Sequence, residues 1–584
     1  MSNEMSNPYS GLWKICGDNT ERNWIKVSAW SICIGFALLE LWTGRYYNNP
    51  DGISYLDMSD ALLKHNWQLL VNPYWSPLYP FLIGVARWLF RPSAYWEIPV
   101  VHLVNFGIFL GALAAFEFFL AQVVRVYRRK NDGQVTEPTF PLPVSVWQLV
   151  GYSLFAWSTF VLAKDVLYVT PDLCVMACVY LDAGLLLRLR IEENKLPVFL
   201  LLGITLGLGY YAKAVLFPMA FVFMAVAFLV AGGWRKATLP SLLMFLVFGV
   251  VSAPLFTAIS NSVGHFTFGE SGTNAYATLV GGGQKLPFYG STLPSYLVHP
   301  LNRIHHDPDV FEFSHPFNVT YPIGYDIPYW NAGFKAGIDV RSQLGVLRQS
   351  VMKFFTILIM PMAGPIVCFI ILIMLSTNLP GCLWRIAKSW PLIIPGIAGL
   401  CIYSLVLVES RYIAAFAALI WVGLVSGIRT RRTSDTIRLA SITTLVFVGW
   451  LMTMVAGYCV YHSVRPQPIF QGEGGMYFQV AEALNAEGLQ PGQAVAIVGS
   501  GGDASMWARL ARVRIIAQIP PEDADDFWRA SDPRMKTEVY DAFARAGARA
   551  VVTEETPPSG GFEDWQTVGD TWYHVHFLAS PRSK

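Results

Sequence analysis

Charged side chains are scarce in this sequence of 584 residues, of which Asp, Glu, Lys and Arg make up only 14%. Soluble globular proteins carry about 25% charged residues. A chain that is 54% hydrophobic and so poor in charge cannot cover the surface of several soluble domains. The shortage excludes a wholly soluble globular protein and indicates a polytopic membrane protein with soluble parts. The formal net charge of +2 gives no sign of nucleic-acid binding.

Three further absences narrow the function classes. The eight cysteines include no Cys-x-x-Cys pair, so neither a zinc site nor a thiol redox centre is expected. No short period recurs, which excludes fibrous and solenoid repeats. The turn from Gly499 to Asp503 follows a strand-like run, but the complete fingerprint G-x-G-x-x-G is missing. A tight turn is therefore favoured over a nucleotide-binding loop.

Long apolar runs predict membrane-spanning helices, each of which needs about 20 mostly apolar residues. About eleven such helices are expected, over 24–44, 98–122, 144–163, 166–187, 197–212, 214–232, 239–260, 351–375, 391–409, 411–428 and 438–461. Basic clusters near Arg128, Arg188, Arg235, Arg385 and Arg429 all fall on the cytoplasmic side if the N-terminus is cytoplasmic. We therefore expect a bacterial inner membrane protein whose C-terminus lies in the periplasm.

Three segments then remain on the outer face, namely 45–97, 261–350 and 462–584. None of them contains a cysteine, as suits an oxidising compartment. The last one alternates short apolar strands with helices, which predicts a small α/β domain. Its expected strands and helices cover 493–499, 513–519, 549–554, 571–578, 476–487 and 533–546. The predicted fold is an α-helical membrane module over 1–465 followed by a periplasmic α/β domain over 466–584.

The first outer loop carries a candidate for proton-transfer chemistry. Asp51 lies in a Pro-Asp-Gly turn directly after the first spanning helix. A carboxylate fixed at the lip of an apolar cavity can act as a general base. The structural alternative is that Asp51 caps a short amphipathic helix over 53–63. Asp57 and Asp60 are expected on the solvated side of that helix.

Ionisable residues at the membrane lip are functional candidates. Asp172 lies at the outer start of the fourth predicted helix, Lys213 between the fifth and sixth, and Arg411 at the outer end of the tenth. The alternatives are that Glu409 pairs with Arg411 and that both cations are interfacial anchors. Two cations and two carboxylates at one membrane face suit an anionic, lipid-linked phosphate substrate with a base nearby.

Together these motifs resemble the C-type glycosyltransferases. The resemblance lies in Asp51 and in the runs SPLYP (76–80), TPD (170–172), GLGYYAK (207–213) and ESRY (409–412). It covers roughly 20–460, and the nearest branch is that of the protein O-mannosyltransferases and the aminoarabinose transferases of lipid A. The second outer loop, with FTFGESGTNAY (266–276) and FNVTYPIGYDIPYWNAG (317–333), resembles uncharacterised bacterial members of this group.

The resemblance implies an activity and a set of roles. The chain is expected to transfer a sugar from a polyprenyl-phosphate donor on the periplasmic face, with Asp51 as general base and Asp172 orienting acceptor or sugar. Lys213, Arg411 and Tyr412 match positions near the donor phosphate. Further candidates for contacts with the acceptor or the sugar are Tyr55, Asp57, Glu270 and Tyr325. No cofactor is expected and no metal ligand is assigned, although a divalent cation is not excluded.

One departure from the family bears on the acceptor. Protein mannosyltransferases place an Asp-Glu pair in the first loop, whereas Gly52 follows Asp51 here. This difference favours a lipid or polysaccharide acceptor over a protein. Two other functions stay open: a transporter or flippase of lipid-linked sugars, and a non-catalytic scaffold of a polysaccharide assembly complex. Inverted repeats, or helix pairs broken by Gly or Pro near mid-membrane, would favour transport, and none is evident in the sequence.

Overall fold

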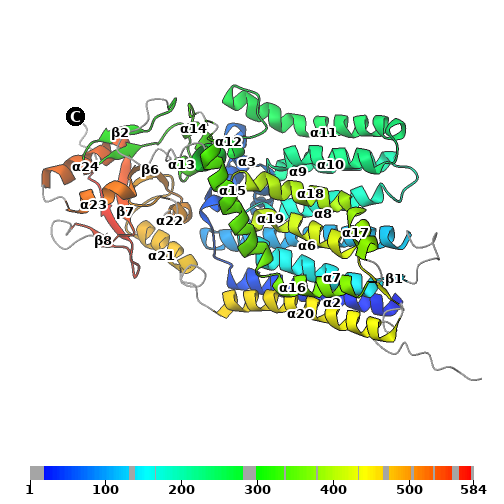
Figure 1. Ribbon diagram of the computed structural model, residues 1–584. Coiled ribbons are helices and arrows are strands. Elements are labelled where there is room, and N and C mark those ends of the chain that lie inside the picture. Colours follow the sequence, from blue (N-terminus) through cyan, green and yellow to red (C-terminus); the bar gives the residue numbers. More distant parts are fainter. Residues whose placement is uncertain are drawn as a thin grey trace, which may run out of the picture.

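Long helices running side by side form most of the molecule, and a smaller α/β domain lies against one end of this bundle (Figure 1). The structure is a computed structural model. It describes residues 19–129, 139–164, 166–280, 297–334, 337, 339–376, 379–431, 433–464, 473–501, 505–529, 533–555 and 564–579.

Every apolar run predicted to span a membrane is helical over most of its length. The corresponding helices are α2 (Asn19–Thr43), α6 (Ala94–Arg129), α7 (Val144–Ala156) with the π-helical turn η1 (Trp157–Ala163), α8 (Asp172–Arg188), α9 (Leu196–Ala212), α10 (Leu216–Val230), α11 (Trp234–Val263), α15 (Val340–Phe354) with η2 (Phe355–Ile359), α16 (Ala363–Met374), α18 (Trp390–Ser404), α19 (Ser410–Val425) and α20 (Ser434–Val464). The short helix α17 (Leu379–Ala387) precedes α18, and strands β1 (Thr139–Pro141) and β4 (Arg429–Arg431) pair at the far end of the bundle.

Five of the described helices are long and apolar enough to cross a membrane, or up to seven if each bent pair counts as one span. The bent pairs are Val340–Ile359 with Ala363–Met374, at 72°, and Leu379–Ala387 with Trp390–Ser404, at 67°. The chain is thus a multi-pass membrane protein, while the count of eleven spans stays a prediction. Pro361 lies in the first of these breaks, which the apolar pattern of the sequence did not reveal.

The first outer segment is helical rather than a loop. It folds into α3 (Pro50–Leu63), α4 (Trp67–Leu70) and α5 (Leu78–Phe90). Asn49 occupies the N-cap position of α3 and Pro50 follows it at the start of the helix, where proline costs no hydrogen bond. Asp51 is therefore in the first turn of α3 and is not its cap, which corrects the structural alternative drawn from the sequence.

The C-terminal region forms the expected α/β domain, but part of its sheet comes from the second outer loop. The strands, in sheet order, are β2 (Asn302–His305), β3 (Val310–Glu312), β6 (Arg514–Ile519), β5 (Ala494–Val498), β7 (Ala548–Thr553), β9 (His574–Phe577) and β8 (Gln566–Thr567). Strands β5, β6 and β7 are parallel, and the other pairings are antiparallel. Four helices belong to this domain: α21 (Glu473–Ala486), α22 (Ser505–Leu510), α23 (Pro521–Arg529) and α24 (Pro533–Ala546). The turn after β5 is described only up to Gly501, so Asp503 lies outside the described residues.

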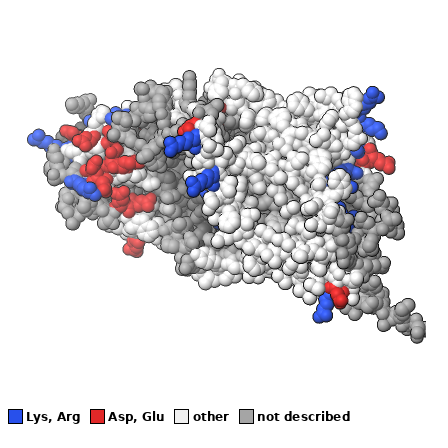
Figure 2. Space-filling view, viewed as in Figure 1, with Lys and Arg blue, Asp and Glu red and all other residues white. Residues whose placement is uncertain are grey.

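A buried ion network joins this domain to the bundle. Arg509 of α22 is bonded to Asp57 at 2.8 Å, to Asp60 at 2.5 Å and to Glu97 of α6 at 2.9 Å. Arg87 of α5 also binds Asp60 and Glu97, at 2.6 and 2.9 Å, and Arg512 binds Glu97 at 3.1 Å. Three guanidinium groups therefore balance three carboxylates. Outside this junction, the face in Figure 2 shows an almost uncharged bundle beside a domain with many acidic side chains.

The expectation that Asp57 and Asp60 face solvent was wrong. Asp57 is buried and also accepts hydrogen bonds from the Thr320 backbone amide at 2.9 Å and its hydroxyl at 2.8 Å. Burial raises the pKa of Asp57 even though Arg509 acts in the opposite sense. Burial also acts to raise the pKa of Asp60, but Arg509 and Arg87 outweigh it and hold that pKa below its usual range. The polar side of α3 is thus covered by α22 of the α/β domain.

Replacing Arg509 tests how far this junction stabilises the fold. Arg509→Met leaves Asp57 without its nearest cation, and breaking a buried ion pair in this way costs about 3–5 kcal/mol. We expect a clear fall in the midpoint of thermal unfolding of the detergent-solubilised protein. The control is Arg529→Met, because Arg529 is exposed and, among the described residues, its ion pair is with Asp525 one helical turn away. Its effect is expected to stay within about 0.5 kcal/mol. Equal midpoints for the two variants would contradict a structural role for the network.

Candidate active site

The candidate site is a cavity of about 460 Å³ at the end of the bundle that faces the α/β domain. Its walls come from the start of α3, the loop at 74–76, the segment 170–172 before and into α8, and the α9–α10 junction at 213–218. Residues 268–275 and the α18–α19 junction at 402–412 complete it. Six separate segments of the chain therefore meet at one end of the bundle.

Asp172 is the most buried ionised group of the cavity. It lies in the first turn of α8, where the helix dipole favours a carboxylate, and its side chain is 2% exposed. One carboxylate oxygen is bonded to the Lys213 ammonium. The other has no hydrogen-bond partner among the described residues and lies 3.7 Å from Nε of Arg411. Asp172 thus holds both cations of the site.

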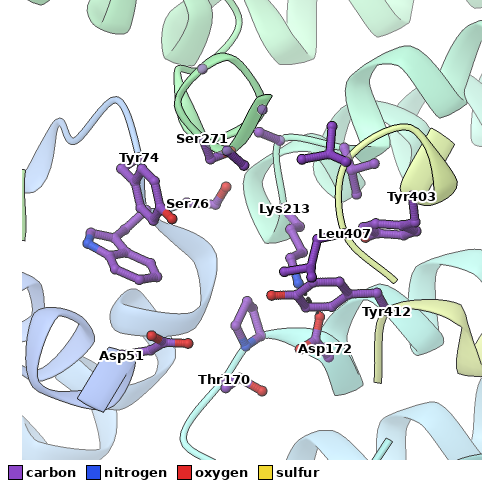
Figure 3. Close-up of a pocket in the computed structure, with 18 of the residues that line it drawn as sticks. Asp51, Tyr74, Ser76, Thr170, Asp172, Lys213, Ser271, Tyr403, Leu407 and Tyr412 are labelled. Carbon is purple, nitrogen blue, oxygen red and sulfur yellow. Dashed lines mark hydrogen bonds and ion pairs between the residues drawn. The ribbon is translucent and has the colours of Figure 1, made fainter. Parts of the chain in front are cut away.

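Asp51 lies across the cavity from Asp172 and Lys213 (Figure 3). Its carboxylate oxygen is 3.2 Å from Nη2 of Arg411, and its side chain is 38% exposed, against 20% for Arg411. Arg411 therefore contacts both carboxylates, and Asp51 is the one that an incoming molecule can reach. The two carboxylates balance the charges of Lys213 and Arg411, so the charged side chains that line the cavity sum to about zero.

Aromatic rings hold the two cations in place. The Lys213 ammonium lies 3.8 Å from the centre of the Tyr412 ring, and the Arg411 guanidinium lies 5.1 Å from it. Tyr403 stacks on Tyr412 with ring centres 5.0 Å apart. Contacts of this kind stabilise a cation by about 0.5–2 kcal/mol. Tyr412 therefore fixes the direction in which both positive groups point.

A second aromatic wall stands near Asp51. Tyr55 of α3 packs edge to face on Trp75 at 5.1 Å, and Trp75 packs on Tyr74 at 4.6 Å. Burial, followed by the charge of Asp51, raises the pKa of Tyr74 to about 12, so its hydroxyl stays a hydrogen-bond donor at neutral pH. Flat apolar faces with few polar atoms are typical of small-molecule sites.

The second outer loop covers the cavity. The Tyr210 hydroxyl donates to the Phe268 carbonyl at 2.7 Å, and the Glu270 amide donates to the Pro73 carbonyl at 2.7 Å. Between them Gly269 has φ +139°, a conformation that residues with a side chain rarely adopt. A Cβ there would also stand 3.1 Å from Ala214 Cβ. Beyond it, α12 (Ser271–Leu279) presents only small side chains to the cavity, at Ser271, Gly272 and Ala275.

Most of the residues singled out from the sequence meet at this cavity. Asp51, Tyr55, Asp172, Lys213, Arg411 and Tyr412 all line it. Three other predicted contact residues do not line it: Asp57 is held by Arg509, Glu270 points its side chain to His265 at 3.1 Å, and buried Tyr325 donates to the Leu69 carbonyl. Glu409 is paired with Lys353 at 2.9 Å.

Sequence reasoning did not assign a role to several lining residues. Tyr74 and Trp75 directly precede the SPLYP run, and Thr170 directly precedes Pro171 and Asp172. The one available signal was that Tyr74 and Trp75 lie next to a motif and that Thr170 belongs to one. Tyr403 carried no signal, because aromatic residues are common near membrane interfaces. Among the described residues, no group of three or more His, Cys, Asp or Glu is arranged to hold a metal ion.

No protein-family model matches the sequence, and no curated protein matches it significantly. Solved structures do match. ArnT from Cupriavidus metallidurans bound to undecaprenyl phosphate has a TM-score of 0.53 at 12% identity, covering 96% of this chain and 99% of that chain. The apo state of ArnT from the same organism has a TM-score of 0.52 at 12% identity, covering 95% of this chain and 99% of that chain. An oligosaccharyltransferase from Archaeoglobus fulgidus has a TM-score of 0.47 at 14% identity, covering 89% of this chain and 67% of that chain.

The similarity to ArnT extends over nearly the whole length of both chains, C-terminal domain included. It shows that this chain has the fold of the C-type membrane glycosyltransferases, as the sequence motifs implied. At 12% identity the similarity concerns the fold. The chemistry has to be argued from the residues of the cavity.

Gly269 offers a test of the cavity cover. Gly269→Ala forces a side chain into a left-handed conformation at about 1–2 kcal/mol and presses it against Ala214. We expect the segment 264–275 to become more sensitive to limited proteolysis. Gly272→Ala is the matched control, because a Cβ at Gly272 meets nothing within 4 Å. Equal cleavage rates for the two variants would contradict the tight docking of this cover.

Proposed function

We propose that the chain is a glycosyltransferase that moves a sugar from a polyprenyl-phosphate donor to a lipid or polysaccharide acceptor on the periplasmic side of a bacterial inner membrane. The observation that supports this most is the meeting of Asp51, Lys213 and Arg411 in one cavity of about 460 Å³. That volume suits a sugar phosphate. The fold agrees, since ArnT has been solved with undecaprenyl phosphate bound.

Lys213 and Arg411 are proposed to hold the donor phosphate. Both cations already have a carboxylate partner, so the phosphate joins an existing ion cluster and makes charge-assisted hydrogen bonds with the two side chains. Apolar side chains continue the wall beside the two cations, namely those of Val215, Pro218, Ile402, Val406 and Leu407. They give the first part of a polyprenyl chain an apolar surface next to its phosphate.

Asp51 is proposed to act as the general base. It is the more exposed of the two carboxylates, and the aromatic wall of Tyr55, Tyr74 and Trp75 stands beside it. An acceptor hydroxyl placed there loses its proton to Asp51 and attacks the anomeric carbon, while the bond to the phosphate oxygen breaks. A single displacement of this kind inverts the anomeric configuration. Asp172, which is 2% exposed, is proposed to orient the acceptor or the sugar indirectly, by fixing Lys213 and Arg411.

The choice of acceptor is supported by the packing around Gly52. A Cβ at this position would stand 2.0 Å from Oδ1 of Asn48 and 2.9 Å from Cβ of Val169. The Asp-Glu pair of protein mannosyltransferases therefore has no room for its second side chain here. The chain thus lacks the second acidic group of that pair, and this difference favours a lipid or polysaccharide acceptor over a protein.

Asp51→Asn separates an enzyme from a transporter or a scaffold. The purified protein is incubated with radiolabelled polyprenyl-phosphate sugars and scored for loss of donor. We expect the variant to lose roughly 10²–10⁴-fold in turnover with an unchanged unfolding midpoint. Asp526→Asn, which alters an exposed carboxylate of the α/β domain, is expected to keep full activity. If the wild type consumes none of the donors, or if Asp51→Asn is fully active, the proposal is wrong.

Lys213→Met tests the phosphate site. Loss of one charge-assisted hydrogen bond costs about 1.5–3 kcal/mol, so the KM for the donor is expected to rise roughly 10–100-fold. Lys213→Met also leaves the buried carboxylate of Asp172 without its ammonium partner. The double variant Lys213→Met/Asp172→Asn removes that carboxylate charge, so it separates the loss of the phosphate contact from the cost of an unpaired carboxylate. Lys64→Met, on an exposed lysine outside the cavity, is the control. An unchanged KM in both cavity variants would refute the assignment of Lys213.

A further inference from the structure

Helix α15 differs from the other long helices of the bundle region. Its sequence, VRSQLGVLRQSVMKF, carries three cations and no acidic residue. An apolar stripe with spacings of four and seven residues runs along it and is exposed, with Val340 at 65%, Leu344 at 62% and Val351 at 64% exposure. The helix is therefore amphipathic, with nothing in the described residues covering its apolar side.

The direction of α15 sets it apart as well. It forms one continuous helical segment with η2, and this segment is bent by 72° relative to α16. Figure 1 shows α15 running across the ends of the bundle helices, at the border with the α/β domain, rather than along them. A helix that crosses the end of a membrane bundle in this way lies parallel to the membrane surface.

Two of its cations are available to a partner. Arg341 and Arg348 are exposed, and neither has an ion pair among the described residues. Asp339, which precedes the helix, uses its oxygens to cap it, accepting from the Arg341 amide at 2.9 Å and from the Ser342 hydroxyl at 2.6 Å. Lys353 is paired with Glu409. In Figure 2, basic side chains stand at the border between the uncharged bundle and the α/β domain.

We propose that α15 is a membrane-surface helix that binds acidic phospholipids of the outer leaflet. Its apolar stripe enters the interface, and Arg341 and Arg348 contact the lipid phosphates. The combination of an exposed apolar stripe, unpaired arginines and an orientation along the surface is typical of helices that lie in the headgroup region. The spacing of seven residues places both arginines on the same side of the helix.

Helix α15 is hydrogen-bonded to the segment that forms one wall of the cavity. Gln343 donates to the Leu405 carbonyl at 3.1 Å, Ser350 to the Ser404 carbonyl at 2.9 Å, and Lys353 to the Val408 carbonyl at 3.0 Å. The same junction between α18 and α19 supplies cavity-lining residues from 402 to 407 and leads into Arg411. A lipid that immobilises α15 therefore immobilises this wall too.

Hydrogen–deuterium exchange tests the proposal without use of activity. The full-length protein is placed in nanodiscs of phosphatidylcholine, alone or mixed with phosphatidylglycerol. Each cation near an anionic surface strengthens the attraction roughly fivefold, so we expect amides of α15 to exchange at least roughly fivefold more slowly in the acidic nanodiscs. Helix α24 serves as the internal reference, because it lies in the α/β domain, on the side away from the bundle, and its exchange should not change.

Two matched variants decide the role of the arginines. Arg341→Gln/Arg348→Gln is expected to abolish the difference between the two nanodiscs, and Arg341→Lys/Arg348→Lys to retain most of it. The proposal is overturned if wild-type α15 exchanges equally in both lipids, or if the Gln variant keeps the difference. Slowing by inorganic phosphate added to phosphatidylcholine nanodiscs would assign the site to a free anion and also overturn it.

Discussion

The carboxylate of Asp172, buried between Lys213 and Arg411, is the constraint on which the arrangement of this cavity depends. An ionised group at 2% exposure is costly unless cations reach it. Asp172 lies at the start of α8, Lys213 at the end of α9 and Arg411 at the start of α19. One carboxylate therefore brings three helix ends together. Tyr412 then keeps both cations pointed at it. The cluster is at once a structural junction and the most polar part of an otherwise apolar bundle.

Buried carboxylates are also paired with a cation at the other end of α3. Arg509 reaches Asp57 and Asp60, so the α/β domain holds the helix that starts with Pro50 and Asp51. One end of α3 thus meets Arg411 and the other meets Arg509. Two strands of the second outer loop extend the sheet of the α/β domain. The position of Asp51 is therefore fixed by three parts of the chain, which explains how an exposed carboxylate keeps a defined direction at the mouth of the cavity.

Much of the fold and part of the cavity could be predicted from the sequence, because charge is rare in a membrane bundle. Asp172, Lys213 and Arg411 stood out for this reason, and the structure brings them together. The same reasoning failed for Asp57, since an amphipathic pattern does not tell whether water or Arg509 covers the polar side. Tyr74 and Tyr403 were missed because a ring in the sequence carries no sign of its partner. Gly269 was missed because its φ depends on contacts to Ala214 and Pro73, which are distant in sequence.

The near-neutral charge of the side chains that line the cavity suits the transfer that we propose. When an acceptor hydroxyl gives its proton to Asp51, the negative charge of that carboxylate disappears. At the same time the leaving phosphate gains one negative charge, so the total within the cavity stays constant while its location changes. Arg411 is bonded to Asp51 before the transfer, and it is proposed to bind the phosphate as well. As Asp51 becomes neutral, the guanidinium is released to interact more strongly with the phosphate, which favours the transition state over the bound substrate.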